Sequence, residues 1–190
     1  MKTDYLFLTP ERIFDLTYQL GEKIKKSGFE PDCLLGISRG GLWIVRILSD
    51  FFGIKDVHVI GVIYYKDVKN TQKKPDLTQD IDKKHLENKK VLIIDDVSDT
   101  GGSLDFTVNL LKNGRIKDFK TATLHYKPWS TFKPDYFIKK TDKWIIYPWE
   151  IGETVRLIMK KDITQEEKME EIRRTGMPSE MIKKYLDKFE

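Results

Sequence analysis

The sequence predicts an α/β fold, a mainly parallel sheet flanked by helices, because one pattern occurs twice along the chain. An apolar run leads into a glycine-containing loop and then into a helical pattern, at residues 33–52 and again at residues 91–112. Parallel strands that alternate with helices produce this pattern. Further apolar strands are expected at residues 57–63 and 119–126. Ligands usually bind such sheets at the carboxyl ends of the strands, so the loops that follow these strands are the first candidates for a site.

Helices are also expected near both ends of the chain. Thr9 and Pro10 form a typical helix start, and apolar residues then recur at helical spacing up to Gly28. Near the C-terminus, Thr164 and Glu167 have the spacing of a capping box, and a second apolar stripe follows. We therefore expect an N-terminal helix that covers the sheet and two short C-terminal helices with a structural role.

Length and charge limit the possible classes of function. A chain of 190 residues can form one core but hardly two, so we expect one domain at residues 1–152 and a helical tail at residues 153–190. The net charge of +4 is mild and the basic residues are spread along the chain, which argues against a nucleic-acid partner. These features are compatible with an enzyme that binds small anionic substrates.

The sequence also predicts where the protein is found. Cys33 is the only cysteine, which excludes an intramolecular disulfide and favours a reducing cytosol. The N-terminus lacks a signal peptide, and no apolar run reaches the roughly 20 residues of a membrane span. We therefore expect a cytoplasmic protein with no membrane partner.

The segment VLIIDDVSDTGGS, residues 91–103, carries the clearest functional signal. It is an apolar strand that ends in Asp95 and Asp96, and paired carboxylates suit either Mg²⁺ or the hydroxyls of a ribose. The loop that follows opens onto a helix N-terminus, where backbone N–H groups and the helix dipole favour an anion. Its candidate phosphate-binding residues are Thr100, Gly101, Gly102 and Ser103. The dinucleotide and Walker glycine motifs are both absent, so this combination predicts a phosphorylated sugar as the ligand.

A second glycine loop follows the strand that begins at Cys33. It contains Ser38, Arg39 and Gly40, and a guanidinium beside exposed backbone N–H groups is well placed to bind phosphate oxygens with two hydrogen bonds. Taken alone, this loop would be an ordinary turn between a strand and a helix with a solvated arginine.

Together these motifs resemble the type I phosphoribosyltransferases over about residues 30–152. Residues 91–103 resemble the motif that binds 5-phosphoribosyl-1-pyrophosphate (PRPP), and Asp99 before Thr100 is typical of the 6-oxopurine branch. The resemblance implies that Asp95 and Asp96 bind the ribose hydroxyls, that Thr100 to Ser103 bind the 5-phosphate, and that Asp99 lies beside N7 of the purine. GISRGGL, residues 36–42, resembles the pyrophosphate loop, for which a cis peptide is expected between Ser38 and Arg39.

The stretch between Lys66 and Leu86 has no apolar period and predicts a long irregular loop. The resemblance places a flexible lid at about residues 64–86, with Tyr65 matching a tyrosine at its start. A serine is expected beside that tyrosine, and Tyr64 departs from this pattern. A lid of this kind would exclude water and so prevent hydrolysis of PRPP.

The base is expected to bind a hood at about residues 127–150, an aromatic segment that we expect to be irregular. Lys127 follows a predicted strand, and its ammonium donates well to a C6 carbonyl oxygen but poorly faces the amino group of adenine. By resemblance, Trp144 stacks on the base and the backbone of Ile145 reads its far edge. Glu150 stands where the family commonly has aspartate and is a candidate Mg²⁺ contact together with Asp95 and Asp96.

The resemblance implies a 6-oxopurine phosphoribosyltransferase of purine salvage. It would convert PRPP and guanine, hypoxanthine or xanthine into the nucleoside monophosphate and pyrophosphate, with Mg²⁺ as cofactor and a homodimer or homotetramer as the assembly. Asp99, Arg39 and Tyr65 are the candidate catalytic residues. Two alternatives remain at this point: an enzyme for adenine or another base, and a non-catalytic regulator that senses PRPP or nucleotides.

Three histidines lie far apart in the sequence without the spacing of zinc ligands, and we expect them to be structural: His58, His85 and His125.

Overall fold

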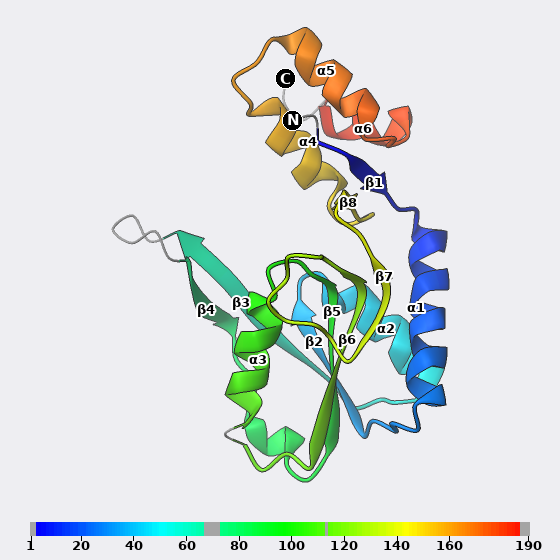
Figure 1. Ribbon diagram of the computed structural model, residues 1–190, viewed down its shortest axis with the longest axis vertical. Coiled ribbons are helices and arrows are strands. Elements are labelled where there is room, and N and C mark those ends of the chain that lie inside the picture. The colour runs from blue at the N-terminus through cyan, green and yellow to red at the C-terminus, as the bar shows by residue number, and fades with distance from the viewer. Residues whose placement is uncertain (1–2, 67–72, 113, 187–190) are drawn as a thin grey trace. The chain divides into compact units, whose positions relative to one another are not determined.

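A computed structural model describes residues 3–66, 73–112 and 114–186 (Figure 1). By its internal contacts the chain divides into two units. The core unit is Phe14–Thr141, and the terminal unit consists of Met1–Ile13 and Asp142–Glu190. We expected a domain at residues 1–152 and a tail at residues 153–190. The contact units have other bounds, but they do not test whether either segment is a domain, so this division remains a prediction.

The core unit is built on a six-stranded sheet with the order β4-β3-β2-β5-β6-β7. All neighbouring strands pair in parallel except β3 and β4, which confirms the predicted mainly parallel α/β fold. The strands are β2 (Cys33–Ser38), β3 (Val57–Lys66), β4 (Lys73–Gln79), β5 (Lys90–Ser98), β6 (Asp118–Tyr126) and β7 (Tyr136–Lys140). The two central strands, β2 and β5, are those whose apolar runs are most continuous, since both of their faces are covered.

Helices cover both faces of this sheet (Figure 1). On one face, α3 (Gly102–Lys112) packs Leu104, Val108 and Leu111 against alternate residues of β2 and β5. On the other face lies α2 (Gly41–Phe52), which comes so close that a methyl group built on Gly36 would lie 2.8 Å from Cγ2 of Val45. The core-unit part of α1 (Pro10–Lys26) packs on α2 through the edge-to-face rings of Tyr18 and Phe51.

Two segments that we expected to be irregular contain strands. Residues 73–79 form β4, which pairs antiparallel with β3, and a short 3₁₀ helix, η1 (Lys83–Leu86), follows. In the predicted hood, β7 closes the other edge of the sheet. Both are edge strands, which are held by main-chain hydrogen bonds on one side and need no apolar alternation. Whether the segment at residues 64–86 acts as a lid remains a prediction, and residues 67–72 lie outside the described residues.

The terminal unit combines a two-stranded parallel sheet with three helices. The sheet pairs β1 (Tyr5–Phe7) with β8 (Trp144–Ile146), and the helices are α4 (Ile151–Met159), α5 (Gln165–Arg174) and α6 (Ser179–Leu186). The capping box predicted at Thr164 and Glu167 is present at the start of α5. Two short helices were expected in the tail, and α4 is a third whose buried residues form a core with α5 and α6.

No helix in the described parts of the chain has both the length and the hydropathy that crossing a bilayer requires.

Candidate active site

The two adjacent acids lie at the carboxyl end of β5, in the middle of the sheet. Both are nearly buried, Asp95 with 9% and Asp96 with 6% of its surface exposed. The backbone N–H of Asp96 donates to Oδ1 of Asp95 at 2.9 Å, which orients the first carboxylate. A nearly buried pair of carboxylates offers only oxygen ligands, the donor set that Mg²⁺ prefers and that ribose hydroxyls can also use.

The glycine loop after β2 lies directly against these acids. A methyl group built on Gly40 would lie 2.2 Å from Oδ2 of Asp96, and one built on Gly41 would lie 2.4 Å from the carbonyl oxygen of Ile94. A side chain at Gly40 would require the loop or the carboxylate of Asp96 to move, and one at Gly41 would require the loop or the strand to move. The peptide bond between Ser38 and Arg39 is cis, as predicted, and the side chain of Arg39 is exposed. The fold thus brings the predicted pyrophosphate loop next to the predicted ribose-binding acids.

The loop between β5 and α3 forms a small cradle. A pocket of about 70 Å³ lies within it, well below the roughly 300–1,000 Å³ of sites for drug-sized ligands. Gly101 has φ +91°, a left-handed conformation that favours glycine, and the hydroxyl of Thr100 accepts the N–H of Gly102 at 3.4 Å. The pocket is lined by Asp95, Val97, Ser98, Asp99, Thr100, Gly101, Gly102, Ser103 and Leu104. A small anion at the N-terminus of α3 fits this geometry.

The segment that follows β6 contacts the cradle through Thr131 and Phe132. The carbonyl oxygen of Thr100 accepts both the N–H of Thr131 at 3.0 Å and its hydroxyl at 2.8 Å. The hydroxyl of buried Ser98 donates to the carbonyl oxygen of Phe132 at 2.7 Å. A methyl group on Gly101 would lie 2.5 Å from the backbone nitrogen of Phe132, so this glycine is also required for close packing. Sequence reasoning missed this support, since none of these residues forms a recognisable motif.

Trp129 links Asp99 and Lys127, two of the residues that were predicted to contact the base. Its indole N–H donates to Oδ1 of Asp99 at 3.1 Å, and Nζ of Lys127 lies 5.2 Å from the centre of its ring. Lys127 is 6% exposed, and its backbone N–H donates to the carbonyl oxygen of Ser98 at 3.0 Å, which ties the end of β6 to the end of β5. Trp129 was not predicted as a site residue. Its position two residues after Lys127 was the signal available in the sequence.

The other predicted site residues lie in β3 and in the terminal unit. Tyr65 lies within β3, and nothing is described of its side chain. Trp144 and Ile145 lie in β8, with 51% and 7% exposed surface, and Glu150 directly precedes α4. These last three residues belong to the terminal unit, where Trp144 lines a pocket of about 230 Å³ together with Tyr5 and other residues of that unit.

Comparison with known proteins identifies the family of this chain. A family model for the phosphoribosyl transferase domain matches residues 7–155. The hypoxanthine-guanine phosphoribosyltransferase of Saccharomyces cerevisiae is 28% identical, over 80% of this chain and 88% of the relative. Xanthine phosphoribosyltransferase 1 of the same yeast is 26% identical, over 78% of this chain and 91% of the relative. The crystal structure of a purine phosphoribosyltransferase from Pyrococcus horikoshii Ot3 is 37% identical, with a TM-score of 0.70 over 77% of this chain and 95% of that one.

Proposed function

The chain belongs to the phosphoribosyltransferase family as a type I enzyme, and from this premise we propose that its acceptor is a 6-oxopurine. In the proposed reaction the bond between C1′ of PRPP and its pyrophosphate breaks, a bond from C1′ to N9 of the base forms, and the base loses one proton. The products are a purine nucleoside 5′-monophosphate and pyrophosphate.

The observation that carries the choice of base is the group of Asp99, Trp129 and Lys127. A nearly buried ammonium at Lys127 supplies hydrogen-bond donors for a C6 carbonyl oxygen, whereas an amino group at C6 would leave it unsatisfied. The carboxylate of Asp99, oriented by the indole N–H of Trp129, accepts a proton or a hydrogen bond from N7. This donor and acceptor pair favours guanine, hypoxanthine and xanthine over adenine.

The remaining residues position PRPP. In this proposal the cradle of residues 99–103 holds the 5-phosphate, and the loop with Ser38, Arg39 and Gly40 holds the pyrophosphate. Asp95 and Asp96 hold the ribose hydroxyls, and their oxygen donors also fit Mg²⁺. Mg²⁺, which the family typically uses with PRPP, would neutralise charge on the pyrophosphate when bound. Positioning and charge stabilisation then supply much of the rate.

Several expectations from the sequence stay part of the proposal. They are the catalytic role of Tyr65 in a lid, stacking of Trp144 on the base, recognition of the base by the backbone of Ile145, and a Mg²⁺ contact from Glu150. We also keep a homodimer or homotetramer as the proposed assembly, which light scattering on the purified chain would test.

A panel of nucleobases with PRPP and Mg²⁺ tests the choice of base. Pyrophosphate release should occur with guanine, hypoxanthine or xanthine and not with adenine. Replacing Asp99→Ala should lower kcat/KM by about 10²- to 10⁴-fold, and Asp162→Ala, an exposed acid of the terminal unit, should not. Turnover of adenine alone would overturn the choice of base. PRPP binding without turnover of any base would favour a regulator instead.

A further inference from the structure

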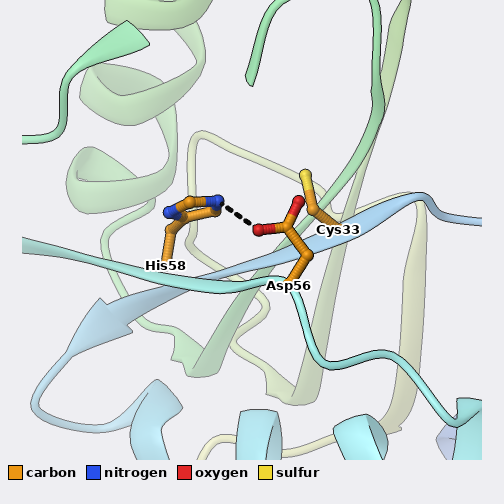
Figure 2. A group of neighbouring side chains, drawn as sticks. All are labelled: Cys33, Asp56 and His58. Carbon is orange, nitrogen blue, oxygen red and sulfur yellow. Dashed lines mark ion pairs between the residues drawn. The ribbon is translucent and has the colours of Figure 1, made fainter. Parts of the chain in front are cut away.

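Three side chains with metal-binding groups meet at the amino ends of β2 and β3, the end of the sheet opposite to Asp95 and Asp96 (Figure 2). We call this end the amino edge and the other end the carboxyl edge. Cys33, Asp56 and His58 each offer one ligand atom, and these atoms all lie within 4.8 Å of one another. Figure 2 shows the carboxylate of Asp56 between the sulfur of Cys33 and the ring of His58. No second group of this kind occurs in the described parts of the chain.

The parallel pairing of β2 and β3 creates the group. Cys33 is the first residue of β2, and Asp56 directly precedes β3, which begins at Val57. The register pairs Leu34 with Val57, so the amino ends of the two strands lie side by side. Asp56 and His58 are two residues apart, the spacing that places side chains on one face of an extended chain.

Burial leaves one side of the group open to solvent. Cys33 is fully buried, whereas the side chains of His58 and Asp56 are 17% and 39% exposed. Nε2 of His58 is buried and lies 2.9 Å from Oδ1 of Asp56. This ion-pair contact holds an imidazole nitrogen and a carboxylate oxygen close enough for both to reach one cation.

We propose that Cys33, Asp56 and His58 bind a zinc ion. Thiolate, imidazole and carboxylate are the ligands zinc takes in proteins, at about 2.0–2.3 Å in tetrahedral geometry. The three ligand atoms lie within 4.8 Å of one another, so the most distant of them would have to approach by about 1 Å to reach this geometry. The fourth position would be filled by water from the exposed side of Asp56. The buried sulfur selects against Mg²⁺ and Ca²⁺, which prefer oxygen ligands.

Lys89 holds the carboxylate of Asp56 in place without belonging to the group of three. Its ammonium donates to Oδ2 of Asp56 at 2.7 Å and to the carbonyl oxygen of His85 at 2.6 Å. Carboxylates that bind metals are commonly held in this way by a second hydrogen bond. One thiolate and one carboxylate neutralise a divalent ion, so the ammonium faces a centre without net charge.

A nucleophilic cysteine is the other chemistry that these three residue types can form. Burial, followed by the nearby carboxylate of Asp56, raises the pKa of Cys33 to about 11, so the free thiol is protonated at neutral pH. A fully buried, protonated thiol is a poor nucleophile. Zinc, in contrast, displaces the thiol proton as it binds.

The site would act as a clip between β2 and β3, separate from the transfer chemistry. Cys33 and Ser38 occupy opposite ends of β2, roughly 17 Å apart at about 3.3 Å per residue. An ion that binds the folded chain and not the unfolded one stabilises the fold by mass action. Zinc should therefore raise the thermal stability without being needed for turnover.

Cobalt absorption on the full chain is the direct test. Co²⁺ added to the metal-free protein should produce a thiolate-to-cobalt charge-transfer band, which Zn²⁺ should abolish and Mg²⁺ should not. Cys33→Ser should remove the band, and Asp56→Asn and His58→Gln should weaken Co²⁺ binding by more than about a hundredfold. The matched control is His85→Gln, since His85 stacks on His58 at 5.8 Å but lies outside the group, and it should keep the band.

A second readout separates this site from the acids at the carboxyl edge. Zn²⁺ at a hundredfold excess over its Kd should raise Tm by about 5–10 °C relative to chelated protein. This shift should be lost in Asp56→Asn, a near-isosteric change at a partly exposed position that remains testable if Cys33→Ser does not fold. The proposal is wrong if Co²⁺ gives no thiolate band, or if the zinc-dependent shift persists in Asp56→Asn.

Discussion

The two ends of β2 carry two different kinds of site. At its carboxyl end, the loop of residues 38–41 lies against Asp96, and its glycines permit this close approach. At its amino end, Cys33 meets Asp56 and His58, and the recognition groups are side chains from two strands. The loop at the carboxyl end consists of consecutive residues. The three residues at the amino end come together only when β2 and β3 pair.

This difference suggests that the carboxyl edge serves turnover and the amino edge serves stability. The carboxyl edge combines polar loops, nearly buried acids and a small cradle, the groups that we propose bind PRPP. The amino edge holds a buried sulfur beside an ion pair, which suits a structural ion. Changes at the carboxyl edge should therefore alter turnover first, and changes at the amino edge should alter stability first.

After Asp99→Ala, the largest effect is expected from Gly40→Ala. The added methyl group would lie 2.2 Å from Oδ2 of Asp96, so either the loop or the carboxylate must move. We expect kcat/KM for the best 6-oxopurine to fall by more than about a hundredfold, since small misplacements of catalytic groups cost that much.

Gly28→Ala is the matched control for this change. Gly28 has φ +78° and open space around an added methyl group, so alanine there is strained without meeting any other atom. It should cost about 1 kcal/mol in free energy of unfolding and leave kcat/KM unchanged. Equal turnover of the Gly40→Ala protein and the wild type would contradict the close packing of loop and acid.

A smaller loss is expected from Lys127→Met, which removes the proposed donor to the C6 oxygen. Hydrogen bonds from charged groups contribute about 1.5–3 kcal/mol, so kcat/KM with hypoxanthine should fall by about 10- to 150-fold. The exposed Lys117→Gln serves as the control. If Lys127→Met affected hypoxanthine and adenine alike, Lys127 would not be the group that selects the base.

Trp129→Phe should have a moderate effect. It keeps an aromatic ring near Nζ of Lys127 and removes only the indole N–H that reaches Asp99. Because Trp129 is 54% exposed, we expect the low end of the range for a charged hydrogen bond, about a tenfold fall in kcat. Trp43→Phe, at another exposed tryptophan, should leave kcat unchanged, and a similar fall in both variants would argue against a role for the indole N–H.

The smallest effect is expected for an ordinary ion pair near the amino edge. Nζ of Lys120 lies 3.3 Å from Oδ1 of Asp135, and both side chains are more than a third exposed. Lys120→Met should therefore lower the free energy of unfolding by less than about 1 kcal/mol in urea titrations. A loss of several kcal/mol would show that this edge depends on surface charge, in contrast to the ion-dependent stability proposed for Cys33.

The pH dependence of that pair has a definite sign. Asp135 raises the pKa of Lys120 above 10.5, so the pair stabilises the fold fully below that pH. The contribution is lost as the pH rises through the folded pKa. The difference between Lys120→Met and the wild type should therefore be present at neutral pH and shrink in alkaline buffer, and a difference that grew with pH would contradict this assignment.

The sequence was most informative where chemistry is local. The strand that carries Asp95 and Asp96 was predicted from consecutive residues, although it continues to Ser98, and so was the glycine loop at Arg39. The cis peptide after Ser38 was predicted from the family resemblance of that loop. It was least informative at sheet edges, where β4 and β7 form without an apolar alternation. Main-chain hydrogen bonds to a neighbouring strand hold these two edge strands in place, and such bonds leave no pattern in the side chains.

By itself, the sequence determined the α/β class, the two anion loops and the family, because strand hydrophobicity, turn glycines and helix starts act between near neighbours in the chain. Only the tertiary structure decided that Trp129 bridges Asp99 and Lys127, and that Cys33 meets Asp56 and His58. These groups depend on strand order and register, and a shift of one residue in a strand would turn its side chains to the opposite face. Short spacings such as Asp56 to His58 and Lys127 to Trp129 are visible in the sequence, but the distant partners Cys33 and Asp99 are brought to them only by the pairing of strands.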